Sequence, residues 1–511
     1  MPPIIEIAQA ILIFVMLAAN VVGAGILLVR LAKFNDHDSW VTAAAMGGAG
    51  LSALGYELWL LGYLNAWNQV CFCISSCAMT LVVAISLKNL HFKILRNTHK
   101  EISSSFRHNF ESKYLAIVTG ATALVAAIAC FKPPINADEV GYHWPAPLLW
   151  ASAHHWVRSP YRFTNGPSFI ELSYIPSALF HNTASGHLTH FLMWIVLLIS
   201  ACSLSKALRA PALPVIAAVM ACPVITIQAA QMTNDLGATS FLISALAILF
   251  SLKGKHFSLR SVLLSAIIFS GAISSKLPFA LGILPMIVLY LWFGLDAKDY
   301  KERFIRVLIF LVPCAVTEML WLAHTYSLTE KLTDIPVATV WSNTNKPADS
   351  AHPYDGALGL AGPPSVEKCL VLLMTPFLTW ISGNQEPFGN RTGPVVPLFL
   401  PAYLFVVFKY KSAETFQKLR IWLFATSAFY FICVGIFVVR TRYHLVVWTI
   451  WSILAGVGYS QLKAKTEGSK HVLLTSIFLL LVTLGCGDSC RTLSKESDTT
   501  SILPQIPWLL K

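Results

Sequence analysis

The sequence is dominated by apolar stretches long enough to cross a lipid bilayer, separated mostly by short polar connections. A spanning helix needs about 20 apolar residues, and stretches of that kind recur from the N-terminal region to near residue 487. Only α-helices and closed β-barrels satisfy backbone hydrogen bonds inside lipid, and long uninterrupted apolar runs indicate helices. The chain is therefore predicted to be an all-α, polytopic membrane helix bundle.

The composition points to the same class of protein. Hydrophobic residues make up 56% of the 511 residues and charged residues only 12%, which is unlike a soluble enzyme. The formal net charge of +12 does not indicate a nucleic-acid partner. Membrane proteins collect Lys and Arg in their cytoplasmic loops, and this bias accounts for most of the excess charge.

Hydropathy predicts about 13–15 spans. Spanning helices are expected at residues 7–30, 41–64, 67–87, 114–131, 187–206, 212–229, 234–252, 260–275, 277–295, 304–325, 395–409, 419–439, 445–462 and 471–487. About two-thirds of the Lys and Arg residues fall in one alternating set of connections, which the positive-inside rule assigns to the cytoplasm. Both termini and two long loops, residues 132–185 and 326–394, are then expected on the outer face.

The second long loop contains a mostly apolar segment, residues 366–381, that is nearly long enough to span. Counting it as a span would reverse the charge bias of every later connection, so we predict a re-entrant or interfacial segment. Pro376 within it fits a broken element. The expected regions are additional N-terminal membrane helices over 1–113, a membrane core with both long loops over 114–462, and a last helix with a short outward tail over 463–511.

Two adjacent carboxylates and a histidine stand at the start of the first long loop. Asp138, Glu139 and His143 follow an apolar stretch that ends near Phe131. Ionisable groups at a membrane boundary are costly to desolvate, so their presence indicates a functional site. The simpler alternative is a solvated loop start in which Asp138 only caps a short helix.

Three further outward-facing features place polar side chains at helix ends. Asp235 follows the segment Gln228–Asn234 at the start of a predicted helix, where it is also a favourable N-cap. Lys276 occupies a very short turn between two apolar helices, where it either binds a phosphate or extends its ammonium group to the interface. Residues 440–444 place two arginines against the positive-inside trend, and a grip on an anionic ligand is one explanation.

Taken together, these motifs resemble the polytopic membrane glycosyltransferases of the GT-C superfamily. The likeness is greatest to bacterial relatives of the protein mannosyltransferases and of the aminoarabinose lipid A transferase. Asp138–Pro145 carries most of it, and Thr233–Leu236, Ser275–Lys276 and Thr441–Tyr443 carry the rest, in the expected order over about residues 114–460. In those relatives the acidic loop follows the first spanning helix, whereas here it follows the fourth predicted one.

The resemblance implies a helix bundle with its active-site loops on the outer face, and an inverting sugar transfer from a polyprenyl-phosphate donor to a lipid, glycan or protein. The expected location is the bacterial inner (cytoplasmic) membrane, with the site facing the periplasm. Asp138 and Glu139 form the implied catalytic pair, with Asp138 as general base. Lys276, Arg440 and Arg442 would neutralise the departing lipid phosphate. The residues implied to orient the acceptor or hold a divalent cation (Mg, Mn or Zn) are Asp235, His143 and Tyr443, together with Glu139.

Two other classes of function remain open. A polysaccharide polymerase or ligase of the cell envelope would also use a lipid-linked donor, but would depend on outer-loop arginines more than on an Asp-Glu pair. A non-enzymatic lipid or sugar transporter would place ionisable residues near the bilayer midplane and would use paired broken helices. The predicted charges lie at outer helix ends instead, which favours chemistry at the membrane surface.

Overall fold

The computed structural model describes residues 4–34, 39–86, 110–134, 136, 138–160, 164–252, 258–295, 299–331, 392–409, 414–435 and 444–494. Across these residues the secondary structure is helical, without a β-strand. The first half contains α1 (Ile4–Leu31), α2 (Ser39–Tyr63), α3 (Gln69–Ser86), α5 (Phe110–Ala129), the π-helical turn η2 (Glu139–His143), α6 (Pro145–Ala153), α7 (Phe169–Leu172), α8 (Ile175–Leu179), α9 (Thr183–Ala207), α10 (Ala212–Met220), α11 (Pro223–Gln228) and α12 (Asp235–Ser251). The second half contains α13 (Leu259–Ile273), α14 (Pro278–Gly282), α15 (Leu284–Leu289), the π-helical η4 (Tyr290–Gly294), α16 (Tyr300–Thr329), α20 (Val395–Lys409), α21 (Glu414–Gly435), α22 (Leu445–Lys463) and α23 (Gly468–Ser494).

Seven of the described helices are long and apolar enough to cross a membrane, namely α1, α3, α5, α9, α16, α22 and α23. Shorter apolar helices, among them α12 and α13, pack within the same bundle. The predicted class, a helical integral membrane protein, is therefore confirmed. The number of about 13–15 spans stays a prediction, because several helices fall short of spanning length.

Two of the predicted spans are broken where proline occurs. The predicted helix over 212–229 is interrupted at Ala221–Cys222, directly before Pro223. The predicted helix over 277–295 is divided into α14, α15 and η4, with Pro278 and Pro285 in the first turns of α14 and α15. Proline lacks the backbone N–H that a continuous helix requires, which explains why the helices end just before these residues. Hydropathy does not register this effect, so it predicted continuous spans here.

The N-terminal helices share one packed interior with the rest of the bundle, since α2 contacts α1, α9, α12 and α13. Glycines allow the backbones of α1 and α2 to approach closely. A Cβ atom on Gly50 would lie 1.8 Å from the carbonyl oxygen of Val21, and one on Gly25 would lie 2.0 Å from that of Met46. Small residues of this kind are a common basis for helix association in membranes, where packing replaces the hydrophobic effect.

Gly50→Ala is expected to destabilise the protein by about 1–3 kcal/mol, because the added methyl group forces α1 away from α2. The measurement is thermal unfolding of the detergent-solubilised chain. Gly120→Ala on α5 is the matched control, because a Cβ atom there meets no atom within 4 Å. Equal unfolding temperatures for the two variants would contradict the close packing of α1 on α2.

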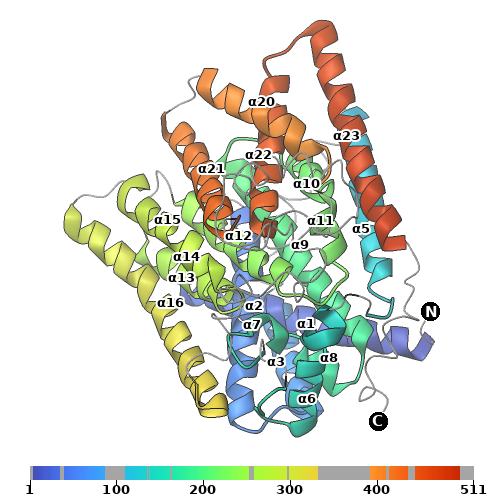
Figure 1. The fold of residues 1–511 in the computed structure, drawn as a ribbon, viewed down its shortest axis with the longest axis vertical. Helices are drawn as coiled ribbons and strands as arrows, with labels where there is room; N and C mark the ends of the chain where they lie inside the picture. The colour runs from blue at the N-terminus through green and yellow to red at the C-terminus, as the bar shows by residue number, and fades with distance from the viewer. Residues whose placement is uncertain are drawn as a thin grey trace, which may run out of the picture.

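The first long loop contains a folded cap rather than an extended chain. In Figure 1, α6, α7 and α8 gather at the lower end of the bundle, whereas the turn between α22 and α23 lies at the upper end. We call residues 138–179, from Asp138 to the end of α8, the cap, and the end of the bundle that carries it the cap end.

Aromatic packing joins this cap to the helices beneath it. The indole of Trp156 lies 4.9 Å from those of Trp67 and Trp150 between ring centroids, and its Nε1–H donates to the carbonyl oxygen of Trp59 at 3.3 Å. Trp59 in turn stacks on Trp321 of α16 at 5.2 Å. These rings lie against one another, so the tryptophans act here as a rigid junction between cap, α2 and α16.

Candidate functional site

The two adjacent acids of the cap lie in different environments. Asp138 precedes η2 with a helical backbone (φ −73°, ψ −36°), and within the described residues its side chain makes no capping hydrogen bond. Its N–H donates instead to Oδ1 of Asn136 at 3.0 Å. Asp138 therefore occupies the N-cap position of η2, but the expected capping by its side chain is absent among the described residues. Asp138 is partly exposed, whereas Glu139 is buried with 1% of its surface exposed.

Glu139 joins the cap to the start of α9. Its Oε1 accepts from the N–H of Met232 at 2.9 Å and contacts Nε2 of His187. Nδ1 of His187 lies 3.0 Å from the carbonyl oxygen of Cys130, and because a carbonyl only accepts, Nδ1 carries a proton. The Glu139–His187 contact then uses the other ring nitrogen. Both side chains are buried, so this contact holds the start of η2 against α9.

A second buried pair lies beside the first. Nδ1 of His143 is 2.7 Å from Oε1 of Glu171, and both side chains are at most 3% exposed. The Tyr174 hydroxyl donates to the carbonyl oxygen of Thr233 at 2.9 Å. Burial raises the pKa of Tyr174, and the carboxylates of Glu171 and Glu139 raise it further. Tyr174 therefore stays protonated and holds the cap to the connection before α12.

Asp235 and Lys276 form an ion pair, and each side chain is only 7% exposed. Asp235 is the first residue of α12, and the N-cap position belongs to Asn234. The interpretation of Asp235 as a simple N-cap is therefore wrong. The Nδ2 group of Asn234 donates to the carbonyl oxygen of Ser275 at 3.3 Å, so a second contact ties the same two connections together.

Three of the four predicted outward features therefore converge at the cap end. The connection between α11 and α12, residues 229–234, lies between the other two. It meets the cap through Glu139, and it meets the segment just before the cap through a 3.4 Å hydrogen bond from Asn136 to Gln231. The helix that follows it meets the turn after α13 through Asp235 and Lys276. Sequence analysis predicted these segments separately, and the structure brings them together.

Of the fourth feature, residues 440–444, the structure describes only His444. Arg440, Arg442 and Tyr443 lie outside the described residues, as does the apolar segment 366–381. His444, which follows them directly, is fully buried before α22, and its ring lies 4.9 Å from that of Phe431. The predicted roles of the arginines and of Tyr443 stay predictions.

Sequence analysis missed three buried residues of this site, Glu171, His187 and His190. His187 and His190 are three residues apart in the first turns of α9 and therefore share a helix face, which was a usable signal. Glu171 is the only acid between Glu139 and Asp235 in the sequence. Nδ1 of His190 lies 2.7 Å from the carbonyl oxygen of Gln228, and its Nε2 has no hydrogen-bond partner among the described residues.

The predicted divalent cation does not fit the acids that were expected to hold it. Glu139 contacts His187 and Asp235 contacts Lys276, so each carboxylate already faces a basic side chain. In the described part of the chain, no group of three or more His, Cys, Asp or Glu side chains is arranged to hold a metal ion.

Of the described acids in this cluster, Asp138 is the most exposed. Glu139, Glu171 and Asp235 are buried against basic partners, whereas Asp138 is partly exposed at the edge of the cap. The arrangement thus places a partly exposed carboxylate next to a set of buried polar contacts that fix the surrounding segments.

No family model matches the chain, and no curated protein matches its sequence.

Proposed function

We propose that this protein is a membrane glycosyltransferase that moves a sugar from a polyprenyl-phosphate donor to an acceptor at the outer face of a bacterial inner membrane. The observation that carries the proposal is the convergence of the segments around Asp138, Asp235 and Lys276 through buried and partly buried polar contacts. These segments carry most of the motif resemblance and are separated by up to about 140 residues in the sequence.

In the proposed reaction, Asp138 accepts the proton of the acceptor hydroxyl or amine as that atom attacks the anomeric carbon of the sugar. The bond from this carbon to the phosphate oxygen breaks, and the polyprenyl phosphate leaves with the bonding electron pair. Direct displacement inverts the configuration at the sugar. A carboxylate that is partly exposed can meet the acceptor and still release its proton to water afterwards.

The remaining residues support this step by position and charge. Glu139 and His143 hold the turn that carries Asp138, through their buried partners on α9 and α7. Lys276 provides a cation for the departing phosphate, and Arg440 and Arg442 are proposed to add to it. Because Lys276 contacts Asp235 in this structure, donor binding has to share or displace that carboxylate.

The test is sugar transfer by the purified chain in liposomes. Radiolabelled sugars are supplied either on polyprenyl phosphate or as nucleotide sugars, together with envelope lipids and glycans as acceptors. We expect labelled product and free polyprenyl phosphate to appear together from the lipid-linked donor only. Movement of intact donor across the bilayer without cleavage would favour the transporter, and transfer from nucleotide sugars would remove the lipid-linked donor from the proposal.

A further inference from the structure

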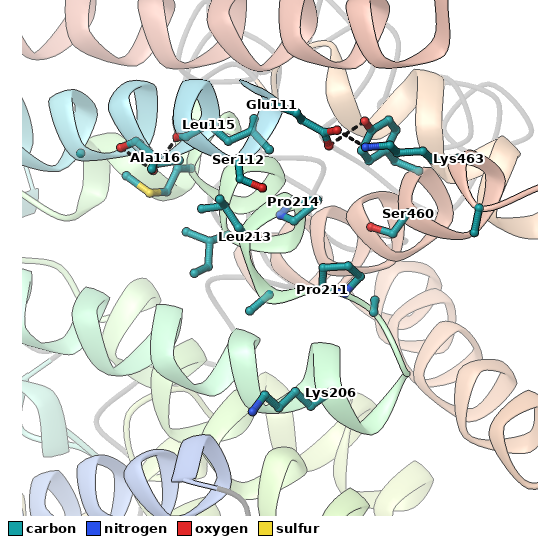
Figure 2. Close-up of a pocket in the computed structure, with 18 of the residues that line it drawn as sticks. Glu111, Ser112, Leu115, Ala116, Lys206, Pro211, Leu213, Pro214, Ser460 and Lys463 are labelled. Carbon is teal, nitrogen blue, oxygen red and sulfur yellow. Dashed lines mark hydrogen bonds and ion pairs between the residues drawn. The ribbon is translucent and has the colours of Figure 1, made fainter. Parts of the chain in front are cut away.

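A large cavity lies at the end of the bundle opposite the cap. Its volume is about 850 Å³, and it lies between α5, α9, α10, α22 and α23 (Figure 2). His187 is near the start of α9 and Lys206 is in its last turn, so the two are separated by roughly 28 Å along the helix. The cavity is therefore distinct from the candidate catalytic site and lies close to the opposite membrane surface.

Charged side chains line one part of this cavity. Glu111 at the start of α5 accepts from the Tyr459 hydroxyl at 2.8 Å through Oε1 and contacts Nζ of Lys463 through Oε2. Lys206 approaches from α9, on the other side of the space from this group (Figure 2). Among the described residues that line the cavity are two lysines and one carboxylate, together with His471. An ammonium group binds a phosphate as a point charge, so this part of the wall suits an anionic head group.

The rest of the wall is apolar. Leu115 and Ala116 of α5 and Leu213, Ile216 and Met220 of α10 supply most of it. A small soluble anion would leave these side chains in contact with water, whereas a hydrocarbon chain would cover them. Trp40 also lines the cavity, and tryptophan is enriched where proteins meet lipid head groups. The cavity thus combines basic groups, which suit an anionic head group, with an apolar wall, which suits a hydrocarbon chain.

We propose that this cavity binds an anionic phospholipid from the leaflet on the lysine-rich side of the membrane. The phosphate lies near Lys206 and Lys463, and an acyl chain lies along α5 and α10. Basic pockets between membrane helices on the cytoplasmic side recognise acidic lipid head groups by this combination of charge and apolar surface. The proposal is independent of the sugar-transfer reaction, because none of its residues belongs to the cap end.

The first test measures binding of phosphatidylglycerol to the full chain in neutral detergent, by native mass spectrometry and by the shift in thermal unfolding temperature. Phosphatidylcholine and glycerol 3-phosphate are the comparison ligands. We expect phosphatidylglycerol to remain bound and to raise the unfolding temperature, with neither effect from the other two. Equal retention of phosphatidylcholine would overturn the charge recognition, and an equal shift with glycerol 3-phosphate would show a soluble-anion site instead.

Lys206→Gln is expected to weaken phosphatidylglycerol binding about fivefold, the effect of one basic group close to an anionic head group. Lys301→Gln is the matched control, because Lys301 is an exposed lysine at the start of α16 and does not line the cavity. Equal affinities for the two variants would overturn the role of Lys206.

A second pair of variants tests the cavity itself. Gly120 lines it, and a Cβ atom at this position meets nothing within 4 Å, so Gly120→Trp fills the space without a clash at its base. Gly487→Trp on α23 adds the same side chain at another open helical position outside the lining. We expect only Gly120→Trp to abolish lipid retention. Unchanged retention in both variants would place the lipid elsewhere and overturn the proposal.

Discussion

Asp138→Asn is expected to lower the rate of sugar transfer by about 10²–10⁴-fold, the usual contribution of a general base. The carboxamide has nearly the same shape as the carboxylate but cannot accept the acceptor's proton. Folding should be little affected, because the side chain of Asp138 is partly exposed and its backbone N–H, which donates to Asn136, is retained. The measurement is initial transfer rate in liposomes at saturating donor and acceptor.

Asp299→Asn is the matched control for this variant. Asp299 is exposed, and its carboxylate accepts from the N–H of Glu302 at the start of α16, a role that asparagine also fills. Both variants lose one negative charge, so a general electrostatic effect would appear in both. Full transfer activity in Asp138→Asn would remove Asp138 from the chemistry and shift weight to a polymerase or ligase centred on Arg440 and Arg442.

The helices of the bundle could be predicted from sequence because a chain inside lipid must satisfy its own backbone hydrogen bonds, which a helix does. The predicted span 187–206 corresponds to α9 (Thr183–Ala207), and 445–462 corresponds to α22 (Leu445–Lys463). Hydropathy could not locate the breaks at Pro223 and Pro285, because an apolar run scores alike whether or not it is continuous. The prolines themselves were the usable signal for these breaks.

The candidate site was predictable in its segments but not in its contacts. Adjacent residues such as Asp138 and Glu139 look equivalent in sequence, yet the turn η2 leaves one partly exposed and buries the other against His187. That difference depends on the packing of α9 under the cap, which is a long-range property. Glu171 was missed for the same reason, since its partner His143 lies 28 residues away.

Lys276 shows that a residue can be placed in a turn between two helices from sequence while its contacts cannot be predicted. Its short turn suggested a phosphate ligand, and Asp235 was assigned separately to the acceptor or to a cation. The two residues are 41 positions apart, and no local pattern indicates that they pair. Lys276 therefore affects stability as well as any function, because removing one partner of a buried ion pair leaves the other charge buried and uncompensated.

Lys276→Met is expected to destabilise the protein by about 3–5 kcal/mol, because Asp235 then loses the ammonium group that neutralises it in a buried site. The double variant Asp235→Asn/Lys276→Met should recover most of this loss, since it removes both charges. Unfolding of the detergent-solubilised chain by heat or denaturant measures all three proteins. A double variant as unstable as Lys276→Met would show that the pair is not what stabilises this junction.

The same double variant separates structure from donor binding, because both charges are absent while the fold is retained. If Lys276 binds the donor phosphate, the KM for donor should rise about tenfold relative to Asp235→Asn alone, the expected loss for one charge-assisted contact. The KM for acceptor should stay the same, since acceptor binding involves a different part of the site. An unchanged donor KM in the double variant would restrict Lys276 to joining α12 to the turn after α13, and would leave the phosphate to the arginines that precede His444.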